Sequence, residues 1–100
     1  MAADHLAAIR LRRAMALQDE AVWLLRNAID LRWLAAQAES TGQSTAMRAE
    51  LAERLAAPHL RDASAETITA LATRLEREAA ALASACASTL RSVPPREGLH

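Results

Sequence analysis

Residues 4–39 read DHLAAIRLRRAMALQDEAVWLLRNAIDLRWLAAQAE, a stretch that contains neither glycine nor proline. It is rich in alanine, leucine, arginine, glutamine and glutamate, which have the highest helix propensities. At about 1.5 Å per residue, a continuous helix over this stretch is roughly 54 Å long, which exceeds the width of a globule of this chain length. The sequence therefore predicts a long first helix that organises the rest of the chain.

Apolar residues cover more than one face of this predicted helix. On a helical wheel, the first stripe has the spacing of a surface that packs on a core. Its members are Leu11, Met15, Val22, Leu25, Ile29 and Trp33. A second row consists of Leu6, Leu17, Leu24 and Leu31. Because a helix on the surface of a monomer needs only one such stripe, we expect the first stripe to be core. The second row then contacts either another helix of the same chain or a partner.

Trp23 lies in the charged sector of the wheel, among Asp19, Glu20 and Asp30. Burying Trp23 inside the monomer would bury these charges as well, whereas tryptophan is frequent at the hot spots of protein interfaces. An isolated surface aromatic is the alternative interpretation. We predict an interface on helix 4–39 formed by Trp23, Ile9, Leu34, Leu17, Leu24 and Leu31.

The remaining chain predicts two shorter helices within a single domain, residues 1–92. The first helix is expected to end in a short polar connector, STGQS, with Gly42 as the stop signal. A second helix is expected over 44–57, with Pro58 ending or kinking it. Ser64 is a good N-cap for a third helix over 65–91, whose apolar stripe runs from Ile68 to Leu90. Residues 93–100 contain two prolines and a glycine and are expected to be a disordered tail. The fold class is all-α, as either a helical hairpin or a three-helix bundle.

Composition restricts the function classes. Basic and acidic residues balance at 12 each, so no net field attracts nucleic acid. No apolar stretch reaches the roughly 20 residues that span a bilayer, and no conventional signal peptide is present, which indicates a cytoplasmic protein or one exported by another route. Half of the hydrophobic residues are alanine, so the core is thin, and thin cores favour oligomers.

Few residues of the sequence suggest a catalytic or metal-binding site. The histidines His5, His59 and His100 have no helical metal-ligand spacing, and two glycines cannot form a phosphate-binding loop. The single Cys86 falls on the apolar stripe of the third helix, where a free cysteine acts as a small hydrophobe. We therefore expect no metal, no cofactor and no catalytic residue.

The turn and second helix read STGQSTAMRAELAERL, with Gly42, Ser44, Met47 and Arg48. This pattern resembles the WXG100 (ESAT-6-like) family of small helical hairpins, with Gln43 where that family has tryptophan. The resemblance implies a paired helical hairpin and an association with secretion.

A second resemblance rests on Leu11, Arg12, Met15 and Asp19 in the first helix and Arg48 after the turn. It is to the all-helical chorismate mutases, and it implies an anion site formed by Arg12 and Arg48. The sequence favours a non-enzymatic protein–protein interaction module, either homodimeric or paired with a similar small helical protein. The alternative is a small helical enzyme that binds an anionic substrate.

Overall fold

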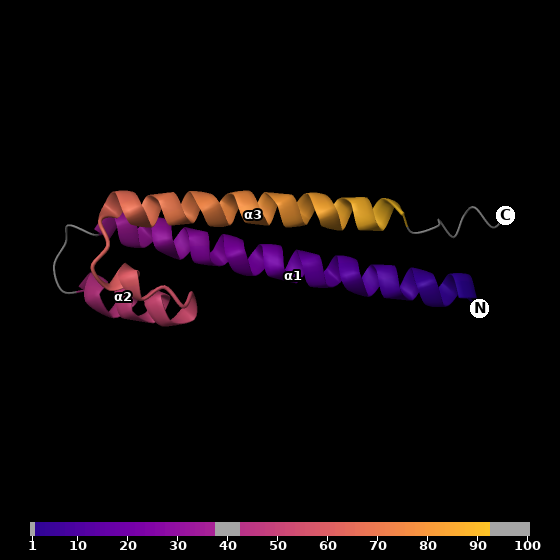
Figure 1. Cartoon of the computed structure of the whole chain (residues 1–100), viewed down its shortest axis with the longest axis horizontal. Helices are drawn as coiled ribbons and strands as arrows, with labels where there is room; N and C mark the ends of the chain where they lie inside the picture. The colour runs from indigo at the N-terminus through magenta and orange to yellow at the C-terminus, as the bar shows by residue number, and fades with distance from the viewer. Residues whose placement is uncertain (1, 38–42, 93–100) are drawn as a thin grey trace.

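The computed structural model describes residues 2–37 and 43–92, and within these ranges the chain is all-α, as predicted. Its elements are α1 (Ala2–Gln37), α2 (Gln43–Arg54), the short 3₁₀-helix η1 (Pro58–Arg61) and α3 (Ala65–Arg91). Helices α1 and α3 lie side by side and antiparallel, and α2 packs beside the C-terminal end of α1 (Figure 1). The molecule is about 64 Å long and 18 Å wide. A long first helix therefore sets its length.

The ends of the long helices follow local capping chemistry. Helix α1 begins at Ala2, two residues before the predicted start, and Asp4 lies in its first turn, where a carboxylate interacts favourably with the helix dipole. Helix α3 has the predicted bounds, and the Ser64 Oγ accepts a hydrogen bond from the Thr67 backbone N–H at 3.2 Å. The predicted end of the first helix, the Gly42 turn and the tail 93–100 lie outside the described residues.

Helix α2 ends three residues earlier than predicted, and proline is not the cause. The backbone N–H groups of Ala56 and Ala57 donate to carbonyls of the last turn of α2, at 3.2 and 2.8 Å. This is a Schellman ending, with Ala56 at the left-handed position with φ 51°, where glycine is usual. Pro58 instead opens η1, and the chain doubles back to start α3 (Figure 1). The predicted hairpin thus describes α1 and α3, with α2 as a short third helix at its closed end.

Helices α1 and α3 meet along a line of small and large side chains with a seven-residue period, which we call the buried seam. On α1, alanine recurs at one seam position and leucine at the other: Ala7, Ala14, Ala21, Ala28 and Ala35 with Leu17, Leu24 and Leu31. On α3 the same alternation consists of Ala72, Ala79 and Cys86 with Ile68, Leu75 and Leu82. All of these residues are buried or half-buried. Alternating spacings of three and four residues are those of coiled-coil packing.

Small seam residues bring the two backbones close together. The Cys86 Sγ donates a hydrogen bond to the Ala14 carbonyl oxygen at 3.2 Å, directly across the interface. Near the open end of the hairpin, the Arg10 guanidinium donates to the Ser92 carbonyl oxygen at 2.7 Å. Cys86 is therefore a packing residue of the seam, as its place on the apolar stripe predicted.

The corner formed by α1, α2 and η1 has its own buried centre. Leu34, Leu51 and Leu60 come from these three elements and are fully buried. Asn27 is 2% exposed and satisfied, because its Nδ2 donates to the Trp23 carbonyl oxygen and its Oδ1 accepts from Arg54. These contacts hold α2 against the last third of α1.

Candidate functional site

The stripe that the sequence assigned to the core is on the surface, which corrects that prediction. Its six side chains on α1 form what we call the exposed seam, with exposed fractions from 39% to 66%: Leu11 44%, Met15 65%, Val22 39%, Leu25 45%, Ile29 66% and Trp33 45%. Scattered exposed apolar residues are ordinary, but these six lie in one row on a single helix face. Trp33 is therefore not a core residue.

The Ala-and-Leu row of α1 is buried, and the stripe of larger residues is not, because the smaller row packs more closely against α3. The Ala-and-Leu row of α1 matches the equally small row of α3, so the two helices approach closely and bury that row. The bulkier side chains of the exposed seam would hold the helices further apart. The core face of α1 was predicted from the helical spacing of one apolar stripe, whereas the available signal was the seven-residue alanine period that recurs on α3.

Helix α3 extends the exposed seam across a shallow groove. The groove measures about 320 Å³ and runs between α1 and the C-terminal half of α3. Val22 and Leu25 form one wall, and Ala83, Ala87 and Leu90 form the other. Leu90, the last residue of the apolar stripe of α3, is 45% exposed. The apolar surface is thus two helices wide near its centre.

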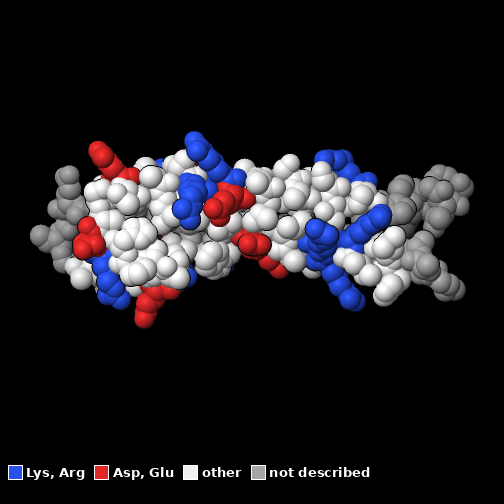
Figure 2. Space-filling model, in the orientation of Figure 1, with Lys and Arg blue, Asp and Glu red and all other residues white. Residues whose placement is uncertain are grey.

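Charged groups without partners border the exposed seam on the side away from α3. Arg12, Asp19 and Arg26 are exposed, and none forms an ion pair or side-chain hydrogen bond within residues 2–37 and 43–92. Charges of both signs are scattered along the molecule, and basic side chains gather over the N-terminal third of α1 (Figure 2). The edge of the seam therefore carries charges available to a partner.

The six residues predicted as the interface do not form one surface. Trp23 and Ile9 are exposed, at 44% and 46%. Leu17 is half-buried in the buried seam. Leu24, Leu31 and Leu34 are buried within the chain's own core, at 7%, 0% and 0%, because α3 and α2 cover them. These three belong to the core, and assigning them to a partner interface was wrong.

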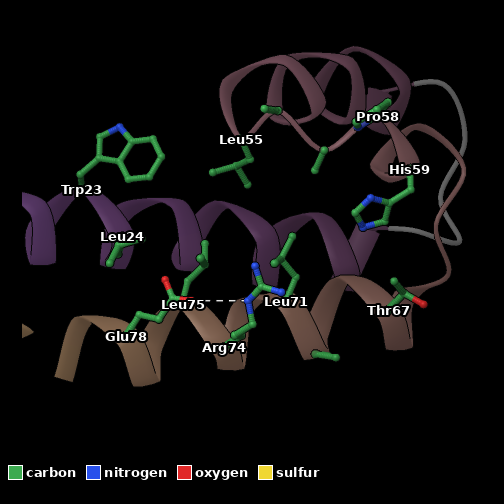
Figure 3. Close-up of a pocket in the computed structure, with 13 residues that line it drawn as sticks. Trp23, Leu24, Leu55, Pro58, His59, Thr67, Leu71, Arg74, Leu75 and Glu78 are labelled. Atoms are coloured by element: carbon green, nitrogen blue, oxygen red, sulfur yellow. Dashed lines mark ion pairs between the residues drawn. The ribbon is translucent and has the colours of Figure 1, made fainter. Parts of the chain in front are cut away.

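Trp23 borders a second groove, of about 610 Å³, between α1, η1 and α3. Its lining is largely apolar: Leu24, Leu71 and Leu75 come from α1 and α3, and Leu55 faces them from the end of α2 (Figure 3). The Trp23 ring lies at one end and the His59 imidazole points in from η1 at the other (Figure 3). Arg74 and Glu78 form an exposed ion pair at 3.5 Å along its edge. This groove lies on a different side of α1 from the exposed seam.

The structure does not bring Arg12 and Arg48 into one anion site. Arg48 lies in α2, and its guanidinium donates to the carbonyl oxygens of Leu60 and Ala63, at 3.1 and 2.8 Å. Arg12 lies on the N-terminal third of α1, at the end far from α2 (Figure 1). Arg48 therefore holds the segment between η1 and α3 in place.

Two ion-pair groups connect the helices. Arg32 of α1 donates two hydrogen bonds to Glu76 of α3, at 2.8 and 2.6 Å, and these lower the pKa of the Glu76 carboxyl. Arg54 of α2 pairs with Asp30 at 2.9 Å and Glu50 at 2.8 Å, and hydrogen bonds to these carboxylates raise the already high pKa of its guanidinium. Both groups position helices.

In the described part of the chain, no three His, Cys, Asp or Glu side chains are grouped in a way that suits a metal ion. None of its helices combines the length and the apolarity needed to cross a bilayer. Comparison of the chain with models of known protein families, with curated proteins and with solved structures finds no match.

Proposed function

We propose that this chain is a non-enzymatic helical interaction module that pairs with itself or with a similar small helical protein through the exposed seam. One observation supports this above all. Large apolar side chains from Leu11 to Trp33 form a row on α1 and are between 39% and 66% exposed, while a different face of the same helix packs in the core. Burying one such side chain contributes on the order of 1.5–3 kcal/mol when it is fully exposed beforehand. Covering the seam is therefore strongly favourable.

The seam is also rigid before it binds. From Arg10 onward helix α1 packs against α3, and its C-terminal end packs against α2, so a partner does not have to order this part of the helix. A preordered surface loses less conformational entropy on association. The position of α2 agrees with this role, since α2 contacts α1 through Asn27 and Asp30 and leaves the exposed seam clear.

The alternative, a small enzyme with an anionic substrate, has no comparable support. Arg12 lies on the N-terminal third of α1, whereas Arg48 lies in α2 at the opposite end of the hairpin and donates to backbone carbonyls. We therefore propose the exposed seam as the binding surface of the protein.

A matched pair of isoleucine variants tests this proposal. Ile29→Glu places a charge in the exposed seam, and Ile9→Glu makes the same change at an exposed position outside it. In sedimentation equilibrium at micromolar concentration, we expect the wild type and Ile9→Glu to have at least twice the mass of the 10.8 kDa chain, and Ile29→Glu to be monomeric with unchanged helical circular dichroism. A wild-type chain that stays a soluble, cooperatively folded monomer at millimolar concentration contradicts the proposal.

A further inference from the structure

We infer that the partner at the exposed seam is a second copy of this chain, with α1 packed antiparallel against α1 and a two-fold axis crossing close to Val22. This inference rests on the proposed function and specifies its partner. A two-fold interface uses the same patch on both copies, so the patch must be complementary to itself when it is turned end for end. The exposed seam has this property.

The spacing of the seam is nearly the same from either end. Leu11 and Trp33 are equidistant from Val22 in sequence, and so are Met15 and Ile29. Reversing α1 about Val22 therefore superimposes five of the six seam residues on seam positions, Leu25 being the exception. An antiparallel copy sets Met15 of one chain against Ile29 of the other, twice, with the two Val22 side chains at the centre.

The unpartnered charges at the border become complementary in the same arrangement. Asp19 and Arg26 lie on opposite sides of the axis, one heptad apart, so Asp19 of each copy lies beside Arg26 of the other. Arg12 of each copy then lies beside the ring of Trp33, where a guanidinium is attracted to the aromatic face. In a parallel pair the two copies of this border would lie on opposite sides of the interface, so Asp19 and Arg26 of one copy would not meet those of the other and this complementarity would be lost.

The area is sufficient for a dimer. The seam extends over residues 11–33, about 33 Å along the helix by its rise. With the width of the hairpin, 18 Å, this gives roughly 600 Å² from each copy, or about 1,200 Å² in total, which reaches the lower end of stable interfaces. The groove beside Val22 and Leu25 borders this interface on the α3 side.

Charge reversal tests the arrangement, because Asp19 and Arg26 are exposed and lie outside the core. At low ionic strength, we expect Asp19→Arg and Arg26→Asp each to weaken self-association by about tenfold, since two attractions become two repulsions. The double variant Asp19→Arg with Arg26→Asp should regain wild-type association, and so should an equimolar mixture of the two single variants. Single variants that associate as tightly as the wild type overturn the inference.

Disulfide trapping separates failure of this arrangement from failure of the proposed function. In a Cys86→Ala background, which places alanine at a seam position like Ala72 and Ala79, we expect a mixture of Met15→Cys and Ile29→Cys chains to form mixed cross-links under oxidation. Each variant alone should cross-link poorly. If the wild type associates but Met15→Cys cross-links to itself, the antiparallel arrangement is wrong and the interaction function stands. A monomeric wild type overturns both.

Discussion

The two seams of α1 differ in side-chain size, and the seam with the larger apolar side chains is the exposed one. The buried seam consists of alanine and leucine, whereas the exposed seam contains methionine, isoleucine and tryptophan, which offer more apolar surface per residue. Burial therefore does not follow the size of the side chain. The face that is buried is the one for which the chain supplies a matching partner, since α3 repeats the same small-and-large period with Ala72, Ala79 and Cys86.

This difference also separates two tasks that apolar residues perform. The buried seam determines how α1 and α3 fold together. The side chains of the exposed seam are 39% to 66% exposed, so they contribute less to the fold of one chain and leave apolar surface available for association. Variants in the two seams should therefore affect different measurements.

The largest expected effect is on folding. Leu31→Ala removes a fully buried side chain of the buried seam and should lower the free energy of unfolding by about 3 kcal/mol, through lost burial and a cavity. Ile29→Ala, two positions earlier but 66% exposed, should change it by less than about 0.5 kcal/mol. Urea denaturation at a protein concentration low enough for the chain to be monomeric gives both free energies of unfolding. Equal losses would mean that the core face of α1 has been misassigned.

Substitutions of the two tryptophans should differ in their effect on self-association. Trp33→Ala truncates the end of the exposed seam and should weaken self-association by about 2 kcal/mol, as a hot-spot residue would, with helicity preserved. Trp23→Ala alters the groove near η1 and should leave the dimer mass unchanged. Sedimentation of both variants decides the matter. The opposite result would place the interface on the Trp23 side, as the sequence alone predicted.

Sequence reasoning succeeded where one element could be judged by itself. The bounds of α3 and the Ser64 cap follow from local capping chemistry, and the burial of Ile68, Leu75, Ala79 and Cys86 follows from the stripe of one helix. It failed where the outcome depended on a second element. Which face of α1 is core depends on what α3 offers, and a helical wheel of α1 does not contain that information.

A smaller effect is expected at the end of α2. Ala56 adopts φ 51°, a left-handed conformation that glycine enters without steric cost. Ala56→Gly should therefore raise the free energy of unfolding by about 0.5–1 kcal/mol, measured by urea denaturation, with no effect on dimer mass. The control is Ala85→Gly, at an exposed position inside α3, which should lower stability by a similar amount because glycine costs conformational entropy in a helix. A loss of stability in both variants would contradict the Schellman assignment. No feature of the sequence marks Ala56, since the usual signal for this turn is glycine.

The smallest effect is a pH dependence at the boundary between the seams. Arg32 lowers the pKa of Glu76 in the folded chain below the ordinary value of 4.5, so the unfolded chain binds a proton more readily in acid. The stability from this pair is present above pH 4.5 and is lost as the pH falls through the lower, folded-state pKa. Glu76→Gln should therefore lose less stability than the wild type between pH 7 and pH 3, by thermal denaturation. An identical loss in both would show that the pair contributes nothing to folding.

The regular period of the buried seam has one more consequence. A surface that repeats every seven residues is almost unchanged when it slides by one repeat, about 10.5 Å along the axis. The alanines and leucines of α1 therefore determine which sides of the two helices meet, but they barely distinguish one longitudinal setting from the next. That setting depends on contacts that do not repeat: Arg32 with Glu76, Arg10 with the Ser92 carbonyl, and the segment that Arg48 holds before α3. In this hairpin the polar contacts therefore fix the longitudinal register of α1 against α3.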